Sequence, residues 1–429
     1  MNTTATPRTR LHVLEVIGNA IVGGMETWVE RLIERMPRDQ FRFTALCPFE
    51  SPFTDRLRAL DVEVLIVPMF DDPPGASIQT ATALVSAGGI DLLHAHLPRA
   101  HVLAGIVGRL TGKPVLATIH SRHMEMLDLE AHRATGSHLS VVCQQSYSHA
   151  MGLGVSAGHL SCEPNGVDTR VFAPGPRSDN ALRAALGLPA EAVLVGFVGR
   201  LSPEKGPEVF IRAAQILCSR PSLVHCVVVG EGPMAAELVD QVARAGLKKR
   251  VHFLGVRHDM PAVYRELDVV VSSSHSEAMP LALMEAMASA LPVIATRVGG
   301  VPDLVEHEQT GWLVAPGDAE DIAGRCGMLT ADAAMRRGMG ERGRQRIAER
   351  FDLAAGVERM GQLFSRLAGV RQDGRRRVST LSALSPAIAG GSVALDAAGR
   401  AATTSEQGTA PSVSAGRQRP AQAGAGAHT

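Results

Sequence analysis

Two glutamates with a defined separation occur in SEAMPLALMEAMASALPVIATRVGG, which covers residues 276–300. Glu277 and Glu285 have seven residues between them, and Pro280 lies in that interval. Proline fits the first turn of a helix, so we expect Glu277 in a loop and Glu285 on the helix that follows. Because a carboxylate accepts two hydrogen bonds, the pair suits a ribose diol or the hydroxyls of a sugar.

Glu285 stands in an almost entirely apolar sequence, MPLALMEAMASALPV. A glutamate on a helix surface is usually solvated, but burying a carboxylate without a partner is costly, so we expect Glu285 to have one. The backbone N–H groups at the start of this helix would point toward an incoming phosphate. The residues concerned are Ala278, Met279, Pro280 and Leu281, of which Pro280 has no N–H.

Two cationic side chains follow another predicted strand. Arg200 and Lys205 lie in GFVGRLSPEKGPEVFI (196–211), in a loop between that strand and a helix. Two cations beside a helix N-terminus suit the negative charge of a diphosphate. A solvated loop with two surface charges fits the same residues equally well.

Glycines occupy two further turns between a strand and a helix. Gly23 and Gly24 lie in VIGNAIVGGMETW, and Gly230 and Gly232 lie in VVVGEGPMAAEL. Glycine lets the backbone approach an anion or a nucleotide closely, but an ordinary tight turn explains each stretch as well. Neither contains G-x-G-x-x-G, which argues against an NAD-dependent dehydrogenase.

Short apolar strands alternate with helices and would position these residues. The predicted strands are 11–17, 62–68, 91–96 and 114–120 in the first half, and 192–199, 223–230, 251–255, 268–274 and 292–297 in the second. This alternation predicts an α/β fold with a parallel sheet in each of two Rossmann-like domains. Ligands bind at the carboxyl ends of such strands, so a cleft between the domains would gather the four stretches.

The chain divides where its composition shifts. We expect an N-terminal domain over residues 1–171, a linker rich in Pro, Gly and Ser over 172–180, and a C-terminal domain over 181–350. Residues 351–370 are predicted to form an amphipathic helix that packs back on the first domain. Residues 371–429 contain no Phe, Trp or Tyr, so we expect a disordered tail that cannot offset its chain entropy by burial.

Composition excludes several classes of function. Lys plus Arg and Asp plus Glu each number 43, and only 3% of residues are aromatic, so no nucleic-acid partner is expected. The six cysteines form no C-x-x-C pair and are expected to be reduced. Without a signal peptide or an apolar run of ~20 residues, the protein is expected to be cytoplasmic. The Arg-rich stretch 26–42 leaves open a peripheral contact with the inner face of the plasma membrane.

No metal site is expected. The histidines of the first domain that could be considered are His94, His96, His101, His120 and His123. His94 and His96 would share one face of a strand, but no third ligand has a clear place beside them. The chain contains no D-x-D pair to hold Mg²⁺ or Mn²⁺ on a diphosphate. His275 is an unassigned candidate for the cleft.

Taken in order, these stretches resemble the family-4 retaining glycosyltransferases, also called glycosyl transferases group 1. The E-x(7)-E motif of that family matches Glu277 and Glu285, and its G-R-L-x-x-x-K-G loop matches residues 199–206. Further matches are GGMET (23–27), TIHS (118–121), PNGVD (164–168) and GGVPDLVEHEQTGWLVAPGD (299–318). The resemblance covers roughly residues 10–369 and is strongest from 192 to 318.

The resemblance implies a GT-B architecture, in which two Rossmann-like domains face each other across a cleft. It implies a nucleotide-sugar donor as substrate, no cofactor, and an acceptor that is a glycan or is linked to a lipid. Arg200 and Lys205 would hold the diphosphate, and Glu285 would bind the ribose hydroxyls. Glu277 would lie beside the transferred sugar, which His120 would face from the first domain.

The glycines would complete the donor site under the same resemblance. Gly23 and Gly24 would lie near the phosphate and the acceptor, and the segment containing Gly230 and Gly232 would border the nucleoside. The sequence departs from the family at Ala278 and Ala290, where glycine is more usual, and at Ser121, where aspartate is common. These departures affect the contact with the donor sugar and any proton transfer at residue 121.

The leading interpretation is a retaining, metal-independent, hexosyltransferase-like enzyme that makes a cell-surface glycan, polysaccharide or glycolipid. One alternative is a GT-B-fold nucleotide-sugar epimerase, which lacks support for two acid/base groups around the sugar ring. Another is a non-catalytic nucleotide-sugar-binding protein, against which the intact glutamate and cation motifs argue.

Overall fold

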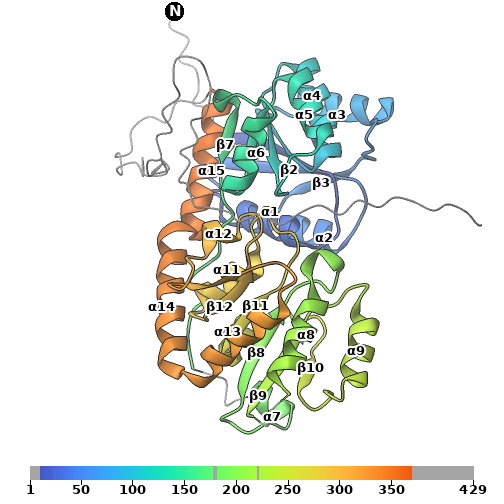
Figure 1. Cartoon of the computed structure of the whole chain (residues 1–429). Coiled ribbons are helices and arrows are strands. Elements are labelled where there is room, and N and C mark those ends of the chain that lie inside the picture. The colour runs from blue at the N-terminus through green and yellow to red at the C-terminus, as the bar shows by residue number, and fades with distance from the viewer. Residues whose placement is uncertain (1–9, 177–180, 220–221, 370–429) are drawn as a thin grey trace, which may run out of the picture. The chain divides into compact units, whose positions relative to one another are not determined.

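Seven parallel strands form the first sheet, in the order β3-β2-β1-β4-β5-β6-β7 (Figure 1). The strands are β1 (Leu11–Ile17), β2 (Phe41–Cys47), β3 (Glu63–Ile66), β4 (Leu92–His96), β5 (Val115–Ile119), β6 (His138–Val141) and β7 (Leu160–Cys162). The computed structural model describes residues 10–176, 181–219 and 222–369. The predicted tail of residues 371–429 and the end of the predicted linker lie outside the described residues.

Helices connect these strands, as parallel pairing requires. They are α1 (Gly24–Arg35), α2 (Pro52–Ala59), α3 (Gly75–Ala87), α4 (Pro98–Thr111), α5 (Met126–Thr135), α6 (Gln144–Gly152) and the 3₁₀ turn η1 (Ala157–His159). Two hydrophobic clusters contain the buried side chains of this sheet, and the inner residues of β1 alternate between them. Both faces of the sheet are therefore covered, which explains the nearly continuous apolar runs in its strands.

Six parallel strands form the second sheet, in the order β10-β9-β8-β11-β12-β13. The strands are β8 (Val193–Val198), β9 (Val224–Val229), β10 (Val251–Phe253), β11 (Val269–Ser272), β12 (Val293–Thr296) and β13 (Gly311–Val314). The helices up to α13 are α7 (Ala181–Ala185), η2 (Pro203–Lys205), α8 (Pro207–Leu217), α9 (Ala235–Arg244), α10 (Met260–Glu266), α11 (Leu281–Ala288), α12 (Val301–Leu304) and α13 (Ala319–Ala331). The expected α/β fold with two Rossmann-like domains is confirmed.

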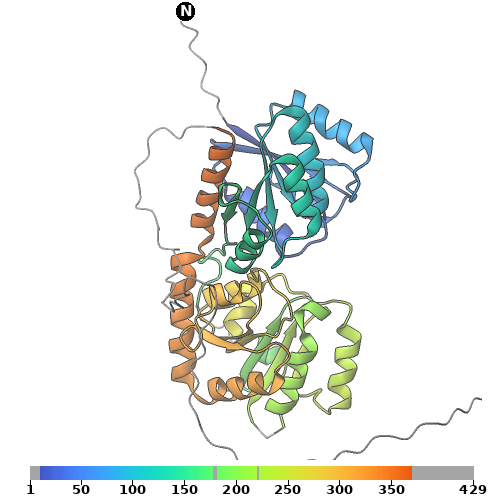
Figure 2. The same ribbon diagram turned by 45° about the horizontal axis from the view of Figure 1, so that its top comes forward.

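The last two described helices belong to different domains. Helix α14 (Ala333–Arg350) contacts α11 of the second domain, whereas α15 (Leu353–Leu367) lies beside the first sheet (Figures 1 and 2). Leu353, Val357 and Phe364 of α15 share a buried cluster with Trp28 of α1 and Phe41 of β2. The described part of the chain therefore returns to the first domain with α15.

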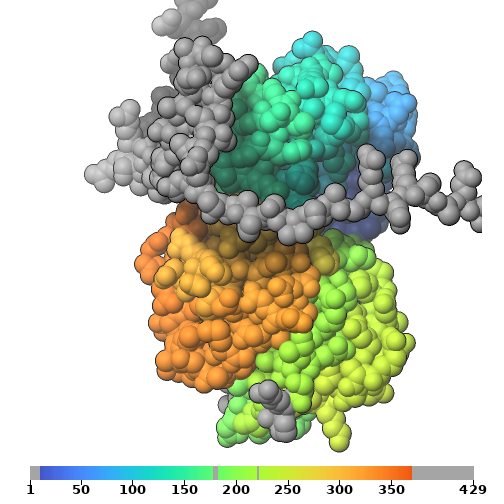
Figure 3. Space-filling view, viewed as in Figure 1, coloured from blue at the N-terminus to red at the C-terminus, as the bar shows by residue number. Residues whose placement is uncertain are grey.

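Figure 3 shows the surfaces of the two domains, with the first domain in blue to teal and the second in green to orange. The described part of the chain belongs to one compact unit. None of the described helices combines the length and apolar content needed to cross a bilayer.

Candidate functional site

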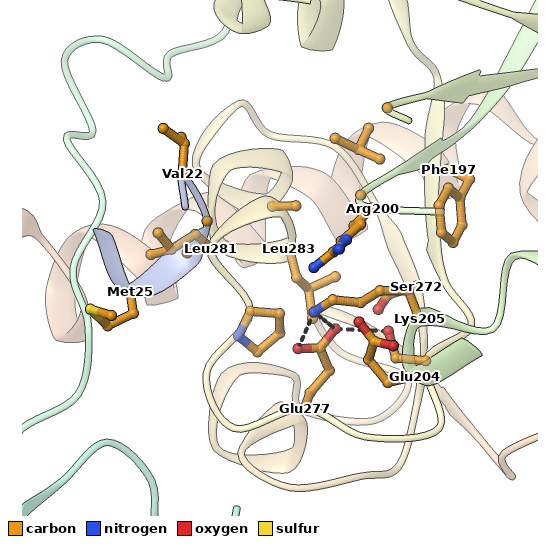
Figure 4. Close-up of a pocket in the computed structure, with 18 of the residues that line it drawn as sticks. Val22, Met25, Phe197, Arg200, Glu204, Lys205, Ser272, Glu277, Leu281 and Leu283 are labelled. Atoms are coloured by element: carbon orange, nitrogen blue, oxygen red, sulfur yellow. Dashed lines mark hydrogen bonds and ion pairs between the residues drawn. The ribbon is translucent and has the colours of Figure 1, made fainter. Parts of the chain in front are cut away.

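A cavity of about 750 Å³ lies between the domains and takes its lining from both of them (Figure 4). The first domain contributes residues from the β1–α1 loop and the start of α1, together with Leu97 after β4. The second domain contributes the carboxyl ends of β8, β9 and β11, the loops that follow them, and the start of α11. The cavity thus occupies the sheet edges at which ligands of α/β proteins bind.

Lys205 and Glu277 form an ion pair inside this cavity (Figure 4). The Lys205 ammonium donates to both carboxylate oxygens of Glu277, at 2.8 and 2.9 Å, and the Ser274 hydroxyl donates to Glu277 Oε1 at 2.7 Å. The loops that carry the pair are joined as well, because the backbone N–H of His275 donates to the Glu204 carbonyl at 2.9 Å. An ammonium has three hydrogens, so Lys205 keeps one for a ligand.

Arg200 enters the cavity beside Lys205 and is exposed (Figure 4). No hydrogen bond or salt bridge joins its guanidinium to another residue in the described ranges. Its five N–H donors therefore face the cavity ready for an anion, and their planar arrangement suits two phosphate oxygens at once.

Helix α11 directs its N-terminus at the same cavity. The first backbone hydrogen bond of the helix runs from Met284 N to the Pro280 carbonyl, so the N–H groups of Leu281, Ala282 and Leu283 have no partner within it. All three residues line the cavity, as does Pro280. These N–H groups, together with the positive end of the helix dipole, have the chemistry to bind an anion.

The N–H groups at the cavity belong to Leu281, Ala282 and Leu283, slightly later in the chain than the residues predicted from the sequence, which began at Ala278. Ala278 and Met279 are buried and do not line the cavity. The Ala278 carbonyl accepts from Gly300 N at 2.8 Å, and the Met279 carbonyl accepts from the Asn165 side chain at 3.3 Å. These two residues support the loop, while Pro280 and Leu281 line the cavity.

Gly23 and Gly24 also line the cavity, at the start of α1. The sequence analysis did not predict a third residue here, Glu26. Its carboxylate lies in the first turn of α1 and accepts a hydrogen bond from the Asn19 amide at 3.1 Å. Burial raises the pKa of Glu26, although hydrogen bonds from its own N–H, Asn19 and Gly23 oppose the shift. A carboxylate of this chain thus already occupies the N-terminus of α1.

The two glycines after β9 have different surroundings. Gly230 lines the cavity and has a φ of +129°, and a Cβ there would meet the Gly199 carbonyl oxygen at 2.0 Å. Gly232 does not line the cavity, and a Cβ there would meet the Leu201 carbonyl oxygen at 2.3 Å. Both positions require glycine for close backbone approach, but only Gly230 can face a ligand in this structure.

Glu285 has the partner that its apolar surroundings demanded. Its Oε1 accepts from Arg31 of α1 at 2.8 Å, and its Oε2 accepts from the Tyr264 hydroxyl at 3.3 Å. Burial nevertheless raises the pKa of Glu285 against both partners. The side chain is buried and does not line the cavity, and its bond to Arg31 links the two domains. The contact of Glu285 with ribose stays a prediction.

His120 follows β5 and lies outside the cavity lining. Its Nε2 is 2.9 Å from Nδ1 of His96, whose Nε2 is 2.8 Å from Glu15 Oε2. Burial, with the nearby His96 and His94, holds the pKa of His120 well below its usual range.

A metal-compatible group occurs in the same network, contrary to the expectation that no third ligand stood beside His94 and His96. Glu15 of β1 is that third group, and the ligand atoms of the three residues lie within 4.8 Å of one another. Within the described ranges it is the one group of three or more acidic, histidine or cysteine side chains that could hold a metal.

The structure therefore brings together Arg200, Lys205, Glu277, the two α1 glycines, Gly230 and the start of α11. Glu285, Gly232 and His120 lie outside the lining, and His275 bonds to Glu208 at 2.9 Å at the surface. Residues that the sequence analysis did not single out also line the cavity, among them Glu26, Glu204, Glu231, Phe197, Val256 and Ser274. Their signal in the sequence is weak, because none of them belongs by itself to a recognised pattern.

Two family models match the chain in order. The model described as Glycosyltransferase Family 4 matches residues 22–171, and Glycosyl transferases group 1 matches residues 178–346. The first match contains strands β2 to β7 of the first sheet, and the second contains all six strands of the second sheet.

Individual relatives and structures agree with these models. A D-inositol 3-phosphate glycosyltransferase of Corynebacterium efficiens is 32% identical over 319 residues, which are 67% of this chain and 74% of the relative. The Escherichia coli UDP-Gal:alpha-D-GlcNAc-diphosphoundecaprenol alpha-1,3-galactosyltransferase is 28% identical over 365 residues, 80% of this chain and 94% of that enzyme. Anabaena Alr3699/HepE in complex with UDP has the same fold, with a TM-score of 0.75, 24% identity and coverage of 83% and 100% of the two chains.

The names of the two relatives favour transfer over epimerisation or simple binding. The chain belongs to the family-4 glycosyl transferases group 1 and is a glycosyltransferase with the GT-B fold.

Proposed function

We propose that the protein transfers a sugar, with retention of anomeric configuration and without a metal ion, from a nucleotide-diphosphate sugar to a glycan or lipid-linked acceptor. The observation that carries the proposal is the convergence of Arg200, Lys205 and the N-terminus of α11 on one cavity. An anion with several oxygens, such as a diphosphate, can use all three at once. The proposal needs no cofactor, because the nucleotide-sugar is a substrate.

The donors available to the diphosphate support a leaving group stabilised without a cation. Arg200 offers a free guanidinium, Lys205 keeps one hydrogen, and α11 offers the N–H groups of Leu281, Ala282 and Leu283. The Lys205–Glu277 pair is close to neutral, so Arg200 and the half-charge at the helix N-terminus supply most of the remaining positive potential. Preorganised donors of this kind act where negative charge develops on the leaving group.

Glu277 has two roles in the proposal. It fixes the Lys205 ammonium through two hydrogen bonds, and its position in the cavity lets it border the transferred sugar. The base of the nucleotide would lie against the apolar part of the cavity lining, which Phe197 at the end of β8 and Val256 after β10 provide. Glu285 is bonded to Arg31 and lies outside the cavity lining, and its contact with the ribose is part of the proposal.

The acceptor would enter from the first domain. The β1–α1 loop places the exposed Ile21 and Val22 in the cavity wall, which suits an acceptor with an apolar part. The name of the E. coli relative includes a UDP-sugar and a diphosphoundecaprenol-linked acceptor, which makes this pairing the first to test. A lipid-linked acceptor would bring a cytoplasmic protein to the inner face of the membrane.

A thermal-shift screen against UDP-, GDP- and ADP-sugars tests the donor class. A ligand at about 100 times its Kd stabilises the fold by ~2.7 kcal/mol, so one nucleotide series should raise the melting temperature clearly. The stabilising donor is then incubated with and without a lipid-diphosphate-linked sugar, and the products are separated by mass. Sugar transfer only with acceptor supports the proposal, whereas an isomerised donor without acceptor would identify an epimerase.

A further inference from the structure

A buried carboxylate joins three strands of the first sheet through histidine side chains. Glu15 of β1 has no exposed surface, and its oxygens lie 3.0 Å from His94 Nδ1 and 2.8 Å from His96 Nε2, both on β4. The other ring nitrogens reach β5 and the residue after it. His94 Nε2 is 2.8 Å from the Thr118 hydroxyl, and His96 Nδ1 is 2.9 Å from His120 Nε2.

These contacts determine which nitrogen of each ring holds the proton. The histidines around Glu15 hold its pKa at about 2 against the opposing effect of burial, so it is a carboxylate that only accepts hydrogen bonds. His94 must then donate from Nδ1, and His96 must donate from Nε2. Burial lowers the pKa of His96 to about 4, so its ring is neutral and its Nδ1 is bare. A bare Nδ1 accepts, which requires His120 to donate from Nε2.

The chain of hydrogen bonds that starts at Glu15 and passes through His96 leaves one ring nitrogen without an assigned partner among the described residues, Nδ1 of His120. The ring of His120 is neutral and uses its one N–H toward His96, so its Nδ1 can only accept a hydrogen bond. We infer that Glu15 and His96 are positioning residues that fix His120 in the Nε2–H tautomer, which leaves His120 Nδ1 as a hydrogen-bond acceptor. The tautomer rests on the contacts of the protein alone, whereas a contact between Nδ1 and the donor sugar rests on the proposed function, because His120 lies outside the cavity lining in this structure.

The surroundings of the network favour hydrogen bonding over a metal ion. Every ring nitrogen of His94 and His96 has a protein partner at hydrogen-bond distance, including the Thr118 hydroxyl on the side away from Glu15. The ring of Phe364 on α15 closes the remaining side, with its centroid 5.1 Å from that of His94. The ionisable groups that face His120 are thus His96 and His94, with Glu15 behind them.

Nitrogen-15 NMR of histidine-labelled full-length protein tests the tautomer without any substrate. The His120 signals are assigned by their loss in His120→Ala, and the coupling pattern of the ring shows which nitrogen is protonated. The wild type should show His120 with a protonated Nε2 and a bare Nδ1, and the same state near neutral pH and at pH 6. A protonated Nδ1, or a mixture of tautomers, would overturn the inference.

Glu15→Gln then tests whether the carboxylate sets that state. The amide can accept from only one histidine and must offer its N–H₂ to the other, so His120 should lose its single tautomer. Asp128→Asn is the matched control, because Asp128 is also a buried carboxylate bonded to a histidine, His101 Nδ1 at 2.9 Å, but has no contact with His120 in the described chain. An unchanged His120 signal in folded Glu15→Gln would refute the role of Glu15.

Kinetics and metal analysis complete the test. With the donor found by the thermal-shift screen, Glu15→Gln should lower kcat on the order of tenfold, keep the nucleotide's thermal shift, and alter the pH profile, whereas Asp128→Asn should not alter that profile. Glu15→Asp keeps the carboxylate, so its kcat should be higher than that of Glu15→Gln. If Glu15→Gln does not fold, Glu15→Asp takes its place in the NMR test, and it should show a single Nε2–H tautomer of His120.

Metal analysis of the purified protein is the last test. One metal ion per chain, lost in Glu15→Gln, would overturn the inference in favour of a metal site. Absence of any transfer activity would contradict the proposed function but leave the tautomer result intact.

Discussion

At the scale of single residues, the ion pair between Lys205 and Glu277 connects the two recognised motifs. Glu277 alone would repel a diphosphate, and Lys205 alone would be a flexible point charge on a long side chain. Together they form a fixed ammonium with one hydrogen left for a phosphate oxygen. The pair therefore makes the loop after β8 and the loop before α11 parts of one site.

Lys205→Ala should weaken a nucleoside diphosphate much more than the bare nucleoside. A charged hydrogen bond contributes roughly 1.5–3 kcal/mol, so the Kd for the diphosphate should rise by about 10- to 150-fold while the nucleoside is nearly unaffected. Titration calorimetry with both ligands measures the difference. Lys249→Ala, on the loop before β10 and away from the cavity lining, is the control and should change neither Kd. Equal losses for both ligands would show that Lys205 acts through the loop's structure.

The network around Glu15 should also give the protein an acid-sensitive stability. The pKa of Glu15 is held at about 2, so its contribution is present above its ordinary pKa of 4.5 and is lost as the pH falls toward 2. The pKa of His96 is lowered to about 4, so its contribution is present above 6.5 and is lost as the pH falls toward 4.

Urea unfolding between pH 7 and pH 3 should therefore show a free energy of unfolding that falls continuously as the pH falls. In Glu15→Gln the fall below pH 4.5 should be smaller, because the group that takes up a proton there has been removed. An identical slope below pH 4.5 in the two proteins would contradict the assigned linkage.

At the scale of elements, the turn after β9 depends on one backbone conformation. Gly230 has a φ of +129°, and its N–H donates to the Gly255 carbonyl at 2.8 Å while Gly199 approaches from β8. This close approach lets the ends of β8 and β9 form one continuous wall of the cavity. Only glycine fits there without moving the neighbouring backbone.

Gly230→Ala should destabilise the protein by roughly 1–3 kcal/mol, the range for a strained backbone position, and should weaken nucleotide binding. Gly324→Ala is the matched control, because Gly324 lies inside α13 with open space around it. Alanine there should stabilise by about 0.5–1 kcal/mol. Chemical denaturation measures both changes, and equal stability of Gly230→Ala and the wild type would contradict the assigned strain.

A comparison of the predicted with the observed strands shows which elements the sequence alone could reveal. The apolar runs of β1, β8 and β9 were recognisable because both faces of their sheets are buried. Strand β2 was missed although it is long, since Arg42 interrupts its apolar pattern, and the short strands β6, β7 and β13 were missed as well. Pairing with a neighbour, which the sequence does not display, makes these segments strands.

The site was predictable where local chemistry decided it and not where tertiary contacts did. The Arg200–Lys205 loop and the N-terminus of α11 could be inferred from strand ends and helix starts. The argument that a buried carboxylate needs a partner identified Glu285, and it applies equally to Glu15 within LHVLEVI. The partners themselves, Arg31 and His96, are 254 and 81 residues away in sequence, so only the fold reveals them.

At the scale of the whole molecule, the bond between Arg31 and Glu285 links the two domains beside the cavity. Both side chains are mostly buried, with 21% and 11% of their surfaces exposed. Arg31 also lies over the Phe172 ring, 5.5 Å from its centroid. A donor whose ribose binds Glu285 would share this carboxylate with Arg31, so nucleotide binding and domain contact would compete for one group.

A double-mutant cycle of Arg31→Ala and Glu285→Gln should give a coupling free energy on the order of 1 kcal/mol in the ligand-free protein. The exposed pair Arg58–Glu50, with 40% and 59% of its surfaces exposed, is the control and should give a smaller coupling free energy, because solvent screens it. With saturating nucleotide the Arg31–Glu285 coupling should shrink. Coupling that is unchanged by nucleotide would remove Glu285 from the ribose site.

The most direct test of the whole account is a transfer assay in EDTA. It uses the donor that stabilises the protein and a lipid-diphosphate-linked sugar acceptor, and it compares the wild type with the Arg200→Ala/Lys205→Ala double variant at matched melting temperature. We expect the wild type to form product in EDTA with the donor's anomeric configuration, and the double variant to lose at least about 100-fold in kcat/KM, as loss of two charged donors implies. Activity that disappears in EDTA and returns with Mg²⁺ or Mn²⁺, or that survives in the double variant, would contradict the proposed leaving-group stabilisation.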